Sequence, residues 1–261
     1  MAVDGFVLDE GEGLPLVAAA IHDGHDVRGE VAEALALSES ERLREEDPFT
    51  GGWTMIAPTR IVGRRSRFEV DLNRPRERAV YRKPEDAWGL RVWERDPSAE
   101  LVARSLAAYD AFYGAVHGLL ARTARRFGRF VVYDLHSYNH RRDGPGAPAA
   151  DPEGNPEVNV GTGTVNRGRW GLLVEAFVDS LRAFEYRGRR LDVRENVKFR
   201  GGHFSHWIHE SFPTDACSLA IEFKKFFMDE WSGEPDPVQL DAIREALAST
   251  VPAVMDALQR V

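Results

Sequence analysis

Cysteine is nearly absent from this sequence of 261 residues, because Cys217 is its only cysteine and cannot form an internal disulfide. We expect this thiol to be a buried spacer before the last strand. Long apolar runs are also missing, since none approaches the roughly 20 residues that cross a bilayer. The N-terminal segment is acidic and lacks the cationic region of a secretory signal. These features predict a cytoplasmic protein without membrane contacts.

Positive charge is in deficit as well, with 34 lysines and arginines against 42 acidic residues and a net charge of -8. Nucleic acids and anionic membranes bind proteins through concentrated positive faces. Here the basic residues form only short pairs, at 64–65, 125–126 and 189–190, which are typical of solvated surface or helix ends. We therefore expect no nucleic-acid or membrane partner, and the oligomeric state stays open.

The chain does contain enough apolar residues, 43%, for one sizeable core, so we expect a single domain over residues 1–261. Hydrophobic runs predict strands at 16–21, 59–62, 67–72, 130–136, 158–160 and 218–223. Helical patterns cover 30–46, 96–127 and 170–186, and a last helix begins at Asp236, with Pro252 expected to kink or interrupt it. Strands that alternate with helices predict an α/β fold, a mostly parallel mixed sheet sandwiched between helices.

Histidines follow two of the predicted strands. The run 16–21 leads into His22 and His25, and the strand that starts at Phe130 leads through Asp134 to His136. Open α/β sheets bind ligands beyond the carboxyl ends of their strands. Three neutral imidazoles bind zinc well and leave a fourth coordination position for water. We therefore predict one catalytic zinc per chain.

Two alternatives to this set of ligands remain. The third ligand could be an acid near His25, namely Asp23, Asp26 or Glu30, or each histidine could be an individually hydrogen-bonded loop residue. Asp134 lies two residues before His136 on the same strand face. There it could orient an imidazole by bonding the ring nitrogen that does not bind the metal.

Glu222 is the acid of the last predicted strand, which is otherwise apolar. A carboxylate in such a strand is costly unless it is paired or used. It could form a structural ion pair with an arginine, or it could act as a general base on water.

The segment after residue 67 offers groups that bind carboxylates. Asn73 and Arg74 follow the predicted strand end, and Arg67 precedes them. A guanidinium binds a carboxylate through two hydrogen bonds, and an amide can add one more. The same residues could equally form a turn with a surface arginine.

Taken together, these motifs resemble the zinc carboxypeptidase-like architecture, and more closely the N-formylglutamate amidohydrolase family. The motifs that carry the resemblance stand in the family's order between about residues 16 and 230. They are the His-Asp-Gly turn at 22–24 and the segments 66–75, 134–137, 159–162, 201–203, 222 and 227–230. The chain departs from the family where Ile21 precedes His22, at 47–50 and at 206–209. We expect these differences to affect the acyl-amino-acid specificity more than the hydrolytic chemistry.

The resemblance implies a zinc-dependent amidohydrolase that releases formate and glutamate from N-formyl-L-glutamate, or cleaves a similar N-acylamino acid. His22, His25 and His136 would hold the metal and Glu222 would act as the base. Arg67 would help to stabilise the oxyanion, Asn73 and Arg74 would grip a substrate carboxylate, and His203 would line the pocket. The alternatives are a carboxypeptidase-like peptidase, a deacylase of another substrate, or an inactive metal-binding or ligand-binding relative.

Overall fold

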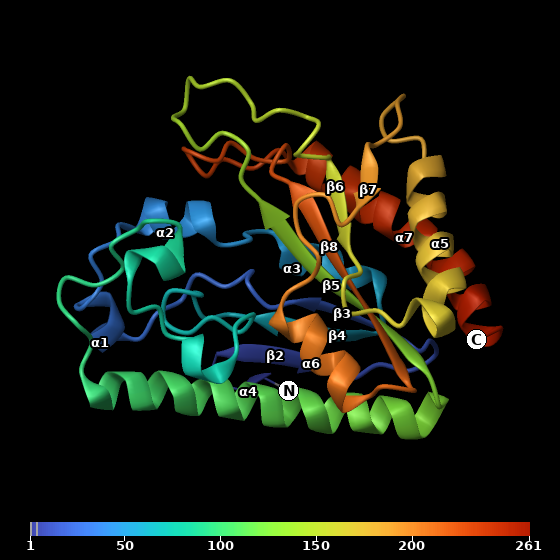
Figure 1. Ribbon diagram of the computed structural model, residues 1–261, viewed down its shortest axis with the longest axis horizontal. Helices are drawn as coiled ribbons and strands as arrows, with labels where there is room; N and C mark the ends of the chain where they lie inside the picture. Colours follow the sequence, from blue (N-terminus) through green and yellow to red (C-terminus); the bar gives the residue numbers. More distant parts are fainter. Residues whose placement is uncertain (1, 4) are drawn as a thin grey trace.

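The computed structural model describes residues 2, 3 and 5–261 and contains one eight-stranded sheet in the order β1-β2-β4-β3-β5-β8-β6-β7 (Figure 1). The strands that pair in parallel are β4, β3, β5 and β8, and β6 pairs in parallel with β7. The pairs β1–β2, β2–β4 and β6–β8 are antiparallel. The predicted mostly parallel sheet between helices is therefore confirmed. The strands span Ala2–Val3, Phe6–Asp9, Leu16–Ala20, Thr59–Gly63, Phe130–Tyr138, Val158–Gly161, Val193–Glu195 and Ala216–Lys224, numbered β1 to β8 in that order.

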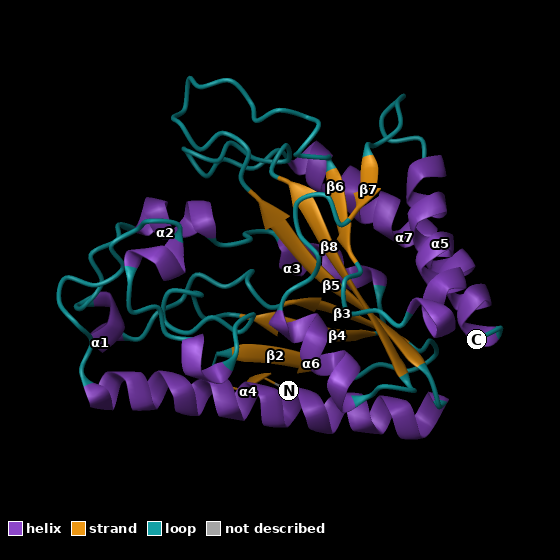
Figure 2. Ribbon diagram, viewed as in Figure 1, coloured by secondary structure: helices purple, strands orange, loops and turns teal. Residues whose placement is uncertain are grey.

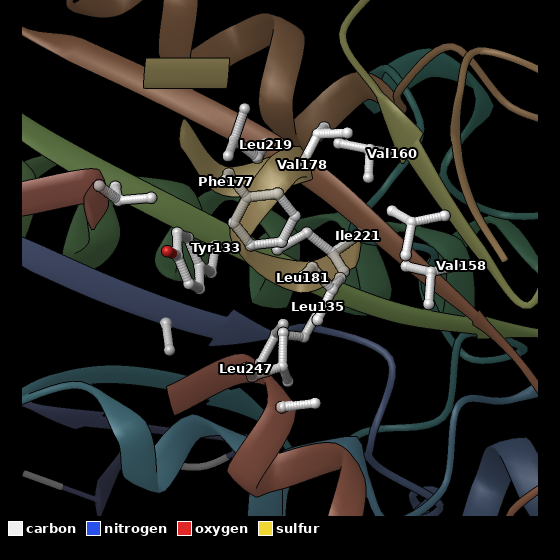
Figure 3. Close-up of a cluster of buried hydrophobic side chains, with 14 of the residues drawn as sticks. Tyr133, Leu135, Val158, Val160, Phe177, Val178, Leu181, Leu219, Ile221 and Leu247 are labelled. Carbon is white, nitrogen blue, oxygen red and sulfur yellow. The ribbon is translucent and has the colours of Figure 1, made fainter. Parts of the chain in front are cut away.

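The central strands β3 and β5 are buried along their whole length, and each face of the sheet has its own apolar core. On one face, α5 (Arg167–Ala183) and α7 (Pro237–Gln259) pack on residues of β5, β6 and β8, such as Tyr133 and Ile221 (Figure 3). On the other face, α4 (Ala99–Phe127) and α6 (His203–Ser211) cover β3, β4 and the start of β5. Because both faces are covered, these strands are continuously hydrophobic instead of alternating.

The predicted helix 30–46 is two short helices, α1 (Gly29–Ala32) and α2 (Glu39–Glu45). Between them Leu35 forms a bridge with Trp93, and Ser38 caps α2 through a capping box with Glu41. Two further short helices, α3 (Thr50–Trp53) and the 3-10 helix η1 (Thr54–Ile56), precede β4. The Leu35–Trp93 bridge and the Ser38 cap thus separate two helices where the sequence pattern predicts one.

The predicted strand 67–72 is wrong, since this segment is a series of turns. The amide of Glu69 donates to the carbonyl of Ser66 (3.0 Å), and the Glu69 carboxylate is buried against Arg28. Two 3-10 helices, η2 (Arg76–Arg78) and η3 (Pro84–Ala87), continue this irregular region up to α4.

Other boundaries also differ from the sequence prediction. Helix α4 begins after Ser98, whose hydroxyl accepts from the amide of Leu101, and not at Asp96. Helix α6 begins at His203, in a segment for which no helix was predicted, and α7 continues through Pro252. As predicted, Cys217 is fully buried, but within β8. Among the helices of residues 2, 3 and 5–261, none is both long enough and apolar enough to cross a membrane.

The carboxyl ends of β3, β5 and β8 point toward the region of long loops (Figure 2). The segment of residues 139–157 leaves β5 there and returns to the sheet at β6, which is antiparallel to β8. This end of the sheet carries the polar motifs that the sequence singles out.

Candidate active site

Three side chains from separate segments converge beyond the ends of β3 and β5. They are His22, directly after β3, His136 in β5, and Asp47, two residues after α2. One ligand atom from each lies within 4.8 Å of the other two, and all three residues are buried. This is the one group of at least three histidine, cysteine or acidic side chains with metal-site spacing among residues 2, 3 and 5–261.

Each imidazole is held from behind by a buried aspartate. Nε2 of His22 lies 2.7 Å from Asp71 Oδ1, and Nε2 of His136 lies 2.8 Å from Asp134 Oδ1. A carboxylate can only accept, so each Nε2 carries a proton, and Nδ1 is the nitrogen that a metal can bind when the imidazole is neutral. The two aspartates therefore fix the tautomer in which both Nδ1 atoms are available as ligands.

Both Nδ1 atoms face Oδ2 of Asp47. The distance is 3.0 Å from His136 and 3.5 Å from His22, and Nδ1 of His22 is buried without a hydrogen-bond partner in the described part of the chain. Three electron-rich atoms at these distances repel one another unless a proton or a cation lies between them. Two imidazoles and a carboxylate are a usual donor set for zinc, so these residues fit a divalent metal.

The ionisable side chains of this cluster shift one another's pKa values. Burial by itself raises the pKa of Asp47, but the neighbouring imidazoles of His136 and His22 reverse the shift and hold its pKa below the usual range. Burial likewise lowers the pKa of His136, and Asp134 and Asp47 outweigh it and raise that pKa well above the ordinary value. The site therefore attracts positive charge.

The structure places the predicted third ligand, His25, outside this cluster. Its Nδ1 bonds to Glu46, its Nε2 lies 3.4 Å from Glu39, and its hydrogen bond with Glu46 raises its pKa. The alternative acids of the sequence analysis, Asp23, Asp26 and Glu30, are not part of the cluster either.

Asp47 is the metal-type residue that sequence reasoning missed, because the segment 47–50 stood out only as a departure from the family. Its amide donates to the carbonyl of His22 (3.0 Å), which ties the two segments together. The ammonium of Lys225, 2% exposed, donates to the carbonyls of Arg44 and Glu46 at 2.6 Å and fixes the chain just before Asp47. No local sequence signal distinguishes Asp47 from its acidic neighbours Glu45 and Glu46.

A cavity of about 340 Å³ opens onto the cluster. Its lining includes most of the other predicted site residues. These are Arg67, Asn73, Arg74 and Glu222. Besides the three cluster residues, the rest of the lining consists of Glu45, Trp88, Ser137, Tyr138, Asn139, Arg142, Phe199, Gly201, Gly202 and Lys225. Asp134, predicted to orient an imidazole, lies behind His136, and His203 does not line the cavity.

Glu222 stands beside His136 in the register of β5 and β8. Burial raises the pKa of Glu222 to about 8; His136 opposes this shift, and Asp47 and Asp134 add to it. No arginine forms an ion pair with Glu222 in the described residues, so the structural ion pair considered from the sequence is not seen. A carboxyl group with a pKa near neutrality, at a cavity wall beside a metal-type cluster, is suited to proton transfer.

Arg67 is held by three acceptors. Its guanidinium donates to Asp71 Oδ2 (2.8 Å), to the Tyr81 hydroxyl (3.1 Å) and to the carbonyl of Glu45 (3.3 Å). Burial works against its charge, but Asp71 raises the pKa of Arg67 well above its usual range. Because Asp71 also holds His22, one buried aspartate orients both an imidazole and a guanidinium at the cavity.

Hydrogen bonds to other segments hold Asn73 and Arg74 in the cavity wall. The amide of Phe204, at the start of α6, donates to Asn73 Oδ1 (2.9 Å), and the amide of Asn73 donates to Asp71 Oδ1 (2.7 Å). Arg74 bonds to the carbonyl of Asp86 (3.3 Å) and its side chain is 29% exposed. His203, expected to line the pocket, instead packs against Tyr113 with ring centroids 5.9 Å apart.

Comparisons with known proteins agree with this architecture. The family model of N-formylglutamate amidohydrolase matches residues 14–227. None of the curated protein sequences matches this chain. The crystal structure of N-formylglutamate amidohydrolase from Ralstonia eutropha JMP134 aligns with a TM-score of 0.76 and 18% identity, covering 99% of both chains.

Two further solved structures are similar to a lesser degree. A gene product from Agrobacterium tumefaciens aligns with a TM-score of 0.63 and 17% identity over 96% of both chains. A putative carboxypeptidase A from Shewanella denitrificans OS-217 aligns with a TM-score of 0.39 and 14% identity, covering 96% of this chain and 60% of its own.

Proposed function

Because the chain belongs to the N-formylglutamate amidohydrolase family, we propose that it uses one zinc ion to hydrolyse the amide of N-formyl-L-glutamate or a similar N-acylamino acid. One observation carries the proposal. The Nδ1 atoms of His22 and His136 and the carboxylate of Asp47 converge at a cavity that also presents Glu222 and the Asn73–Arg74 pair.

The metal ligands in this proposal are His22, Asp47 and His136. Zinc bound there would lower the pKa of a water molecule and polarise a carbonyl group. Asp71 and Asp134 keep the two imidazoles in the tautomer that binds a metal, through their contacts with Nε2. Asp47 takes the place that the sequence analysis gave to His25.

Glu222 is the proposed general base. It accepts a proton from the attacking water and delivers this proton to the nitrogen of the leaving amine. The raised pKa of about 8 suits both steps, because the group must gain and lose a proton near neutral pH. The products are the free acid, formate in the case of N-formyl-L-glutamate, and the amino acid.

The other lining residues position the substrate. We assign the α-carboxylate of the amino acid to Arg74 and Asn73, whose guanidinium and amide can bind it together. We assign the developing oxyanion to Arg67, because the pairing with Asp71 fixes this guanidinium in place before the reaction. Fixed donors of this kind need no reorganisation when charge develops.

The test is zinc content of the purified protein together with formate release from N-formyl-L-glutamate, with and without a chelator. About one zinc per chain and turnover that the chelator abolishes would support both parts of the proposal. A panel of other N-acylamino acids and short peptides defines the substrate class, and turnover of peptides alone would contradict the proposal. A protein that holds no zinc and takes none up would also contradict it.

A further inference from the structure

One positively charged side chain that lines the cavity has neither a role in the proposed reaction nor a place in holding the metal-type cluster. Four lysine or arginine side chains line it, and three of them are already engaged. Arg67 is held by Asp71, Lys225 is held by two carbonyls, and Arg74 is the group that we assign to the α-carboxylate of the substrate. The fourth is Arg142, on the segment of residues 139–157 that leaves β5.

Arg142 forms an ion pair across the cavity with Glu45. Its Nη1 and Nη2 lie 3.3 and 3.1 Å from the two carboxylate oxygens of Glu45, a paired arrangement that a substrate carboxylate could reproduce. The Arg142 side chain is 47% exposed, whereas that of Glu45 is 4% exposed. The exposed Arg142 can therefore change partners at little cost, whereas the buried Glu45 carboxylate needs another cation in its place.

Glu45 would not stay unpaired after such an exchange. Nε of Arg44 lies 3.5 Å from Glu45 Oε1, so a second cation is already in place. The indole of Trp88 packs against the Arg142 guanidinium. Its ring centroid lies 5.9 Å from Cζ of Arg142 and 4.7 Å from Cζ of Arg67. A guanidinium over an aromatic face keeps its in-plane N–H groups available to a new acceptor.

We propose that Arg142 is a specificity-determining residue that exchanges Glu45 for a second carboxylate of the substrate. This inference rests on the proposed function, and it selects N-acylated acidic amino acids over neutral ones. Arg74 and Arg142 then bind the two carboxylates of one substrate inside the same cavity. Glu45 competes with the second carboxylate for Arg142 and shields the guanidinium when the cavity is empty.

The test compares wild type with R142M and E45Q. We measure kcat and KM for N-formyl-L-glutamate and for N-formyl-L-glutamine, which differ only in the second carboxylate. R142M should raise KM for the glutamate substrate and lower the preference for it by roughly tenfold or more, because a charge-assisted hydrogen bond is lost. E45Q should move the preference in the opposite direction, since it removes the competing carboxylate. R141M is the matched control, because it removes the same charge from the same segment and residue 141 does not line the cavity.

Calorimetric binding of glutarate and of its monoamide separates failure of this inference from failure of the proposed function. If wild type hydrolyses no N-acylamino acid of the panel, the proposed function fails, and binding still decides the role of Arg142. We expect R142M to weaken glutarate binding by roughly tenfold and to affect the monoamide far less. Equal effects of R142M on both probes, or an unchanged substrate preference, would overturn the inference.

Discussion

Nδ1 of His136 lies 3.0 Å from Oδ2 of Asp47, although 89 residues separate the two in the chain. Asp47 reaches this position because its amide bonds to the carbonyl of His22 and because Lys225 fixes the two carbonyls that flank residue 45. The contact moves the expected third metal ligand from His25 to a residue outside the strand-end motifs.

The identity of the third ligand can be tested by two substitutions. D47N should weaken zinc binding by more than the roughly 10- to 100-fold that is typical of removing an outer partner, because it replaces a charged ligand with a neutral amide. H25Q should bind zinc as the wild type does, since His25 bonds to Glu46 and Glu39 and lies outside the cluster. Competition with a chromophoric chelator measures both affinities. The opposite pattern would restore His25 as the ligand.

Glu222 should control the acid side of the pH profile. E222Q should lower kcat by roughly 10²- to 10⁴-fold and keep zinc bound, as expected for loss of a general base. Only the deprotonated carboxylate can accept a proton, so kcat/KM of the wild type should fall as pH falls through the pKa of Glu222. Burial raises this pKa to about 8 without metal, and a nearby dication lowers it, so the midpoint should lie below 8. If the residual activity of E222Q falls at low pH with the same midpoint as the wild type, another group causes this fall.

Gly202 should be required for the position of Asn73. A Cβ atom added to Gly202 would lie 2.3 Å from both Oδ1 and Nδ2 of Asn73. G202A should therefore displace the amide and raise KM for an N-acylamino acid, with a smaller change in kcat. G171A in α5 is the control, because no atom lies within 4 Å of its added Cβ. Unchanged KM in G202A would argue against a role of Asn73 in binding.

Ser205 should affect zinc binding without touching the metal ligands. Its hydroxyl donates to Asp134 Oδ2 (2.8 Å), and Asp134 Oδ1 holds His136. S205A should weaken zinc affinity by roughly tenfold, the lower end of the effect of outer partners, because Asp134 loses a bond that orients it. S249A, which removes a hydroxyl bonded only to the carbonyl of Ala246, serves as the control for general destabilisation. Equal zinc affinities of the two variants would contradict this role.

His209 should make the protein less stable in acid. Burial lowers the pKa of His209 to about 4 from its usual 6.5, and its Nε2 accepts from the amide of Ser218 (2.9 Å). The unfolded chain therefore binds a proton between pH 6.5 and 4 that the folded chain does not, so stability falls as pH falls through this window. The loss is at most about 3 kcal/mol, since each pKa unit corresponds to about 1.4 kcal/mol. Urea unfolding of wild type and H209Q from pH 7 to 4 measures it, and parallel curves would exclude the histidine as the cause.

The sequence predicted the sheet because the information is local. Leu16–Ala20, Phe130–Tyr138 and Ala216–Lys224 contain apolar runs that are buried on both faces, and such runs need no distant partner to be identified. The strand Phe6–Asp9 was not predicted, since only its first residue is buried and it gives no apolar run. The predicted strand 67–72 failed because the Ser66–Glu69 turn and a buried ion pair of Glu69 outweigh its alternating pattern.

Sequence alone also indicated that His22, His136 and Glu222 lie near the ends of their strands, because the apolar runs before them show where each strand ends. Only the tertiary structure decided which carboxylate joins the two histidines. Glu45, Glu46 and Asp47 are adjacent acids at the end of α2 and just after it. Packing of this segment on β3 and on Lys225 turns Glu45 toward Arg142, Glu46 toward His25 and Asp47 toward the imidazoles. Contacts between segments far apart in the chain thus assign three chemically similar side chains to three different partners.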